Sequence, residues 1–191
     1  SRTRFEEPRD PTLVHTRQVQ GSQSGVVPGI LSIVTASPEP DLTPFLSQGR
    51  LLLVGYWQSP YEEQYPDPRT LVGAGYPRGL LYRICRYLRA GVTRLSYLGY
   101  SQCRFRCGVP DPEMGTEDLT DGTWVWPEGL AHYVEEHDIV LPAGLVRTME
   151  DHGWRIPEEA GALAAQKSGN SIAYETGFWL EWAAWRGRRG R

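Results

Sequence analysis

Cysteine is scarce in this chain, and its scarcity limits how the protein can be held together. Cys85, Cys103 and Cys107 are an odd number and too few for a disulfide scaffold. A chain of 191 residues is long enough to bury a hydrophobic core without covalent cross-links. We therefore expect a cytoplasmic protein in a reducing compartment, built as one globular domain.

Long hydrophobic runs are also missing. No apolar stretch approaches the roughly 18 to 20 residues of a membrane span, and the first residues lack the apolar segment of a signal peptide. The formal net charge of −3 does not point to nucleic acid or to a membrane surface. Lysine is nearly absent, with Lys167 as the only one, which indicates a GC-rich genome more readily than a function.

Acidic residues are absent from Tyr76 to Pro110, where seven arginines are interleaved with tyrosines. The following stretch, from Asp111 to Asp151, has eleven acidic residues and Arg147 as its only arginine or lysine. Two such halves either neutralise each other on folding or leave a dipolar surface that steers a charged protein partner. The basic stretch could also bind phosphate groups.

Apolar periodicity predicts the fold. Short runs rich in branched residues predict buried strands at Gly29–Ala36 and Leu51–Trp57. Helices are expected from Pro77 to Gly91, from Pro127 to His137 and from Pro142 to Gly153, because proline opens and glycine closes helices. Together these elements predict a single α+β domain with a small mixed sheet flanked by helices.

Three regions are expected along the chain. Residues 1–28 are polar and predict an N-terminal arm, residues 29–157 form the α+β core domain, and residues 158–191 form a helical, aromatic segment with a basic tail. The tryptophans of the last region, followed by arginines, are typical of a helix that covers the core, of a membrane-surface segment, or of a nucleic-acid contact.

Two cysteines and two histidines have the spacing of a zinc site. Cys103 and Cys107 form a Cys-x3-Cys pair, and His132 and His137 form a His-x4-His pair. The predicted helix opposes this assignment, because the two histidines would point about 140° apart around a regular helix. Both could reach one metal ion only if the helix unwinds in its last turn.

Two other interpretations of these residues remain open. A packed or hydrogen-bonded His137, a surface His132 and two reduced thiols need no metal. A cysteine nucleophile activated by an imidazole is the catalytic interpretation, with a third group such as Asp121 orienting the ring and neighbouring arginines favouring the thiolate. Asp121 is more simply explained as a turn residue that accepts hydrogen bonds from nearby backbone amides, with Gly122 adopting the unusual dihedral.

The motifs CRFRCG, TDG, WPEGLAHYV and a following His and Leu-Pro resemble a family of uncharacterised bacterial proteins of similar length. The upstream GYWQSPYEEQYPDP and the YLRAG helix end resemble the same family. The resemblance covers roughly Leu51 to Pro157 and implies a shared fold and a bacterial origin. It implies no activity and identifies no functional residue.

These patterns predict a non-catalytic protein-interaction module, of the accessory or immunity-protein kind, whose partner is another protein. The long proline-rich loop from Gln58 to Gly75 and the basic stretch provide the candidate contacts. The candidate partner-binding residues are Tyr61, Tyr65, Arg78, Arg86, Arg89, Arg104 and Arg106. The alternatives are a zinc-stabilised Cys2His2 module that binds nucleic acid and a cysteine-dependent hydrolase or transferase. Zinc is the only cofactor that the pattern suggests.

Overall fold

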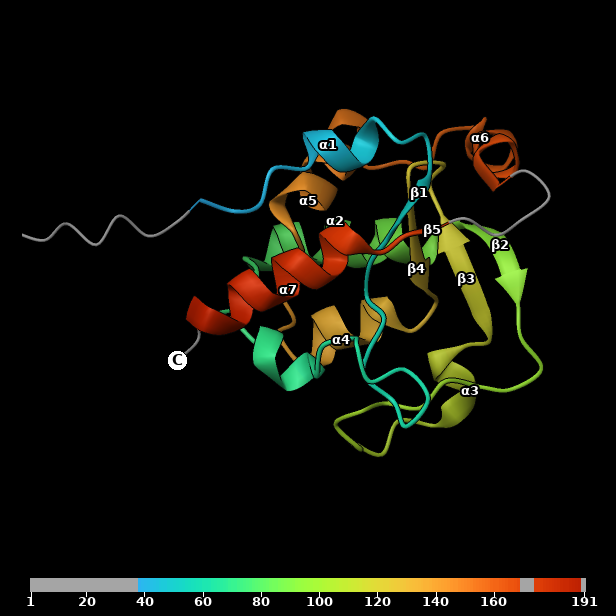
Figure 1. The fold of residues 1–191 in the computed structure, drawn as a ribbon. Coiled ribbons are helices and arrows are strands. Elements are labelled where there is room, and N and C mark those ends of the chain that lie inside the picture. Colours follow the sequence, from blue (N-terminus) through green and yellow to red (C-terminus); the bar gives the residue numbers. More distant parts are fainter. Residues whose placement is uncertain (1–37, 169–173, 190–191) are drawn as a thin grey trace, which may run out of the picture. The chain divides into compact units, whose positions relative to one another are not determined.

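A computed structural model describes residues 38–168 and 174–189, which form helices around a five-stranded mixed sheet (Figure 1). In chain order the elements are α1 (Thr43–Leu46), β1 (Leu51–Leu53), the 3-10 helix η1 (Pro68–Leu71), α2 (Arg78–Arg89), β2 (Val92–Ser96), α3 (Asp111–Met114), β3 (Glu117–Thr120), β4 (Trp124–Pro127), α4 (Leu130–Glu136), α5 (Ala143–Asp151), α6 (Ala160–Ser168), β5 (Tyr174–Glu175) and α7 (Gly177–Arg189). The predicted arm and the predicted strand at Gly29–Ala36 lie outside the described residues.

The sheet has the strand order β2-β3-β4-β1-β5 and confirms the predicted α+β class. Strand β1 runs parallel to both β4 and β5, whereas β2, β3 and β4 are antiparallel neighbours. All three residues of β1 are buried leucines, as expected for a strand that is covered on both faces. The predicted position of Leu51–Leu53 in the interior of the sheet is therefore confirmed.

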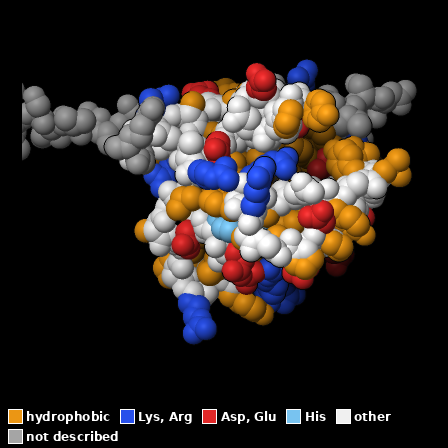
Figure 2. All heavy atoms as spheres, turned by 90° about the horizontal axis from the view of Figure 1, so that it is seen from below, with side chains coloured by type: hydrophobic (Ala, Val, Ile, Leu, Met, Phe, Trp, Pro, Cys, Tyr) orange, Lys and Arg blue, Asp and Glu red, His pale blue; other side chains and the backbone are white. Residues whose placement is uncertain are grey.

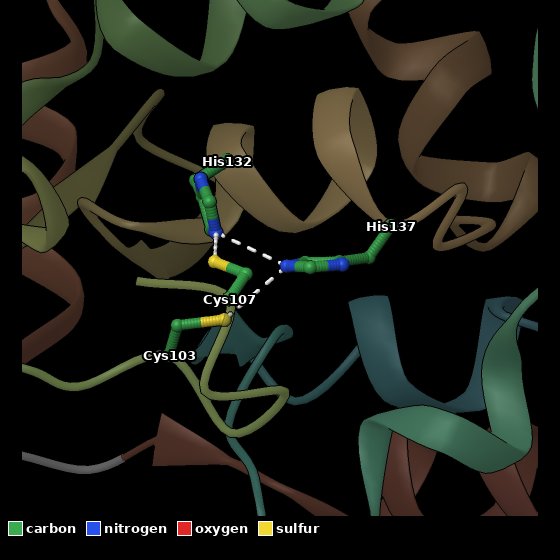
Figure 3. Close-up of side chains that lie close together, drawn as sticks. All are labelled: Cys103, Cys107, His132 and His137. Atoms are coloured by element: carbon green, nitrogen blue, oxygen red, sulfur yellow. Dashed lines mark hydrogen bonds between the residues drawn. The ribbon is translucent and has the colours of Figure 1, made fainter. Parts of the chain in front are cut away.

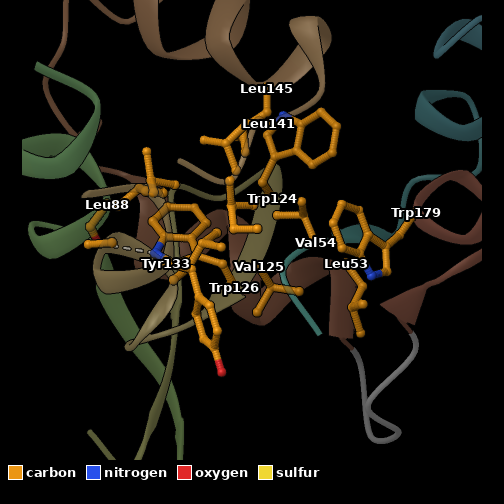
Figure 4. Packing of buried hydrophobic residues seen from close by; sticks show 14 of the residues in the cluster. Leu53, Val54, Leu88, Trp124, Val125, Trp126, Tyr133, Leu141, Leu145 and Trp179 are labelled. Carbon is orange, nitrogen blue, oxygen red and sulfur yellow. Dashed lines mark hydrogen bonds between the residues drawn. The ribbon is translucent and has the colours of Figure 1, made fainter. Parts of the chain in front are cut away.

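Helix α2 packs through the apolar stripe that its sequence predicts. Ile84, Cys85 and Leu88 are buried, and Pro77 precedes the first helical residue. The Leu88 carbonyl accepts a hydrogen bond of 3.0 Å from the indole nitrogen of Trp126 in β4 (Figure 4). Cys85 is a core thiol, and burial is the main cause that raises its pKa to about 11.

The core extends beyond its predicted limit at residue 157. Strand β5 pairs with β1, and helix α7 buries Trp179 and Trp182 in the core. The Trp179 indole donates a hydrogen bond of 2.9 Å to the Tyr56 carbonyl. The tryptophans of the C-terminal segment therefore belong to a core helix, because large aromatic side chains gain most by burial. None of the described helices is long and apolar enough to cross a membrane.

Candidate metal centre

Two segments that are distant in the sequence bring the two cysteines and the two histidines together (Figure 3). Cys103 and Cys107 lie on the loop between β2 and α3, hereafter the cysteine loop (residues 97–110). His132 lies on α4, and His137 caps the C-terminal end of that helix. The four ligand atoms all lie within 4.8 Å of one another.

The end of helix α4 removes the geometric objection to a shared site. The last helical residue is Glu136, and His137 has the non-helical dihedrals φ −127° and ψ 13°. Asp138 follows in the left-handed region at φ 50°, and the Tyr133 carbonyl accepts hydrogen bonds from the amides of both His137 and Ile139. The regular-helix separation of about 140° therefore does not apply. The backbone turns the His137 ring toward the cysteine loop.

Local contacts fix the cysteine loop against α4. The Tyr133 hydroxyl accepts a hydrogen bond of 2.9 Å from the Arg104 amide and donates one of 3.3 Å to the Gln102 carbonyl. The Phe105 ring stacks on His137, with ring centroids 4.1 Å apart and an interplanar angle of 8°. These contacts place Cys103 and His137 side by side.

The distances between the ligand atoms fit a tetrahedral zinc ion. Sγ of Cys103 lies 3.3 Å from Nε2 of His137, Sγ of Cys107 lies 3.4 Å from Nε2 of His132, and the two Nε2 atoms are 3.2 Å apart. With Zn–S near 2.3 Å and Zn–N near 2.0–2.1 Å, the edges of such a tetrahedron are about 3.3 to 3.8 Å. The longest separation, up to 4.8 Å, needs side-chain movements of only about 1 Å.

Burial affects the protonation of His132, His137 and Cys103. It lowers the pKa values of both His132 and His137, so both rings are neutral near neutral pH, which is the form that binds metals. Burial also raises the pKa of the Cys103 thiol. Because zinc binds the thiolate, metal binding must release a proton from this thiol, and zinc affinity must fall as pH falls.

No protein-family model matches this chain. Likewise, no curated protein and no solved structure shows significant similarity to it. The geometry of the four side chains is therefore the observation on which the metal centre depends.

The same geometry lacks the third group of a cysteine nucleophile site. Within residues 38–168 and 174–189, no carboxylate is hydrogen-bonded to the ring of His132 or His137. Asp121, the expected orienting group, is instead buried in the turn between β3 and β4. There it accepts hydrogen bonds from the amides of Thr123 and Trp124 at 2.8 and 2.7 Å. The turn interpretation of Asp121 is confirmed.

The predicted partner-binding residues do not all reach the surface. Tyr61 is 95% exposed, but Tyr65 is only 8% exposed and packs beside Tyr56, which disfavours it as a contact residue. Arg89 forms an ion pair with Glu135 of α4, which joins the basic and acidic halves at that point. The remaining arginines lie on α2, for Arg78 and Arg86, and on the cysteine loop, for Arg104 and Arg106.

Sequence reasoning missed three of the exposed large hydrophobic residues. The alternation of residues from Val92 to Tyr100 predicts a strand that includes Tyr97, Leu98 and Tyr100, but β2 ends at Ser96. The three side chains are 49%, 110% and 57% exposed. Gly99 predicts a possible turn near this point, because glycine inside a strand pattern often marks a bend or a bulge, but β2 ends three residues before it.

Proposed function

We propose that this chain is a zinc-stabilised module that recognises another protein without catalysis. The observation that carries the proposal is the convergence of two thiols and two imidazoles at the distances of a tetrahedral zinc site. A site with four protein ligands leaves no open position for substrate, which is typical of structural zinc. The role of the metal is then to fix the cysteine loop against helix α4.

The recognition surface that we propose consists of Tyr61, Tyr97, Leu98 and Tyr100, here called the aromatic surface. Their exposed fractions range from 49% to 110%. Tyr61 belongs to the proline-rich loop, whose next residue, Glu62, lines a cavity together with Tyr97. Exposed tyrosines on a loop that is held rigid suit protein recognition, because little side-chain and backbone freedom is lost on binding.

The metal centre lies close to solvent. Cys107 is exposed and His132 is partly exposed. Figure 2 views the molecule from below and shows hydrophobic, basic and acidic side chains intermixed on this face, together with a histidine that reaches the surface.

Metal analysis tests the zinc part of the proposal. Protein purified without chelator is expected to contain about one zinc ion per chain, because the four side chains form one closed site. Elemental analysis of the purified chain makes the measurement. Double substitution of Cys103 and His137 by alanine should abolish the zinc content. Wild-type protein that carries no zinc after incubation with a zinc salt would overturn the assignment.

Thiol reactivity separates the structural site from the catalytic alternative. In zinc-loaded protein, Cys103 and Cys107 should react slowly with iodoacetamide, and the exposed Cys107 should react faster once a chelator is added. Cys85 serves as the internal control, because its thiol is buried and has a pKa of about 11. Mass mapping of the alkylated peptides measures each site. Fast alkylation of Cys103 in the zinc-loaded chain would favour a nucleophile.

Charge substitution tests the aromatic surface. Leu98→Asp should abolish binding to the natural partner while leaving zinc content and thermal stability unchanged, since this side chain is fully exposed. Leu46→Asp is the matched control, because Leu46 is 47% exposed on α1 and lies outside the aromatic surface. Affinity capture from a lysate of the source organism, with the wild type, Leu98→Asp and Leu46→Asp as baits, makes the measurement. It identifies partners that the wild type and Leu46→Asp retain and that Leu98→Asp loses. Equal loss in both variants would count against this surface.

A further inference from the structure

The cavity lined by Glu62 and Tyr97 lies where two parallel strands of the sheet end. It has a volume of about 270 Å³. It is lined by Tyr56 and Trp57, which follow β1, and by Pro127 and Gly129 at the end of β4. In sheets with parallel strands, ligands bind in the crevice at the carboxyl ends of these strands. The cysteine loop contributes Ser101, Gln102 and Arg104 to the opposite wall.

Negative charge dominates the lining of this cavity. Three carboxylates line it, from Glu62, Glu117 and Asp118, against the single guanidinium of Arg104. The Arg104 guanidinium already donates a hydrogen bond to the Gln102 carbonyl. The excess of carboxylates disfavours an anionic ligand and favours a cation.

Of the three carboxylates, Asp118 gives the strongest support for a cation site. It is only 2% exposed, and it accepts a hydrogen bond of 2.8 Å from the Tyr97 hydroxyl. Burial is the main cause that raises its pKa, and it outweighs the Tyr56 and Tyr97 hydroxyls and Arg94, which act in the opposite direction. A cation bound beside Asp118 would further stabilise its charged form.

The Tyr56 hydroxyl is a further buried polar group in the cavity. It has no hydrogen-bond partner of good geometry among the described residues, although it lies close enough to the Asp118 carboxylate for the two groups to interact. Burial and then the nearby Asp118 carboxylate raise the pKa of Tyr56, so the hydroxyl stays neutral beside this charge. Buried polar groups without a partner are uncommon and costly, and a ligand that hydrogen-bonds to the hydroxyl would remove the cost.

Aromatic side chains form much of the remaining wall. Tyr56, Trp57, Tyr97 and Tyr133 all line the cavity. Aromatic faces attract cations through their ring quadrupoles, and they cover the alkyl part of a ligand at the same time. A carboxylate combined with aromatic walls is the arrangement that recognises organic ammonium groups.

We propose that this cavity binds a small organic cation, an alkylammonium with a short chain. Its ammonium group donates hydrogen bonds to the Asp118 carboxylate and to the Tyr56 hydroxyl oxygen, and its chain contacts Trp57. The volume of about 270 Å³ limits the ligand to a small molecule. The cavity adds a ligand site to the proposed recognition module and does not depend on the identity of the protein partner.

Calorimetry with three probes of equal chain length tests the charge requirement: n-butylammonium, n-butanol and n-butyrate. Zinc-loaded wild-type protein should bind n-butylammonium at least about tenfold more tightly than either of the other two, because only the cation pairs with Asp118. Equal binding of the alcohol would overturn the proposal. Absence of n-butylammonium binding at concentrations up to tens of millimolar would also overturn it, whatever the zinc content.

Three variants locate the site. Asp118→Asn should weaken n-butylammonium binding by about tenfold or more, and Tyr56→Phe should weaken it by about fivefold, because each removes one hydrogen bond to the ligand. Glu150→Gln is the matched control, since Glu150 is an exposed carboxylate outside the cavity and should bind as the wild type does. Unchanged binding in both cavity variants would overturn the assignment. If Asp118→Asn fails to fold, two other variants test whether the cavity binds n-butylammonium. These are Tyr56→Phe and Glu62→Gln, and the second changes an exposed carboxylate that lines the cavity.

Discussion

Replacing Cys103 with alanine is expected to abolish zinc binding and to lower the free energy of unfolding by about 4 kcal/mol at a free zinc concentration 1,000 times the dissociation constant. The reason is that metal binding to the folded chain adds its free energy to folding, whereas the unfolded chain does not hold the four ligands together. Denaturant unfolding at fixed free zinc, with elemental analysis of the same samples, makes the measurement.

A matched thermodynamic comparison separates the metal from packing. Cys103 is only 8% exposed, so its removal also has a packing cost that is independent of zinc. Wild type and Cys103→Ala should therefore differ far less in excess chelator than in zinc. Cys85→Ala is the control, because it truncates a core thiol and should retain one zinc per chain. An equal effect of Cys103→Ala in zinc and in chelator would show that the residue acts through packing alone.

The identity of the four candidate ligands could be predicted from spacing, but their convergence could not. Sequence periodicity places His132 and His137 on different faces because it assumes a regular helix through His137. The structure ends the helix one residue earlier, with Asp138 in the left-handed region. Asparagine and aspartate tolerate this region better than most residues, yet a single aspartate is a weak signal compared with glycine.

Helices were easier to predict than the remaining strands. Proline and glycine mark both ends of α2, and its apolar stripe agrees with its burial. Strand β3 was missed because its sequence, Glu117–Thr120, contains two acidic residues, and its burial depends on partners from β2 and β4. Strand propensity mainly reflects packing against neighbouring strands, so a four-residue acidic segment predicts a loop until those neighbours are known.

The surface was the least predictable part. Tyr61 and Tyr65 occur four residues apart in the same proline-rich loop, but one is exposed and the other is buried. No period distinguishes them, because the loop has no regular structure, and contacts such as that of Tyr65 with Tyr56 decide which ring faces the core.

Asp121→Ala is expected to lower the free energy of unfolding by about 3 to 5 kcal/mol, because it removes an acceptor that buried groups require. The Asp121 carboxylate accepts hydrogen bonds from the amides of Thr123 and Trp124 and, at 2.9 Å, from the Tyr87 hydroxyl. The Tyr87 hydroxyl also lies 2.7 Å from Nδ1 of His152. One carboxylate therefore joins the β3–β4 turn to α2 and to the end of α5. Denaturant unfolding of the variant measures the loss.

Two milder variants show whether the loss comes from these hydrogen bonds. Asp121→Asn keeps an oxygen for the two amides and should lose clearly less stability than Asp121→Ala. Tyr87→Phe should cost only about 1 to 2 kcal/mol, because it removes one hydroxyl while the carboxylate keeps its amide donors. Asp121 lies outside the metal centre, so any variant that folds should bind one zinc ion per chain. A loss in Asp121→Ala no larger than that in Tyr87→Phe would mean that the two amides find other acceptors. The turn would then owe its stability to the burial of Trp124.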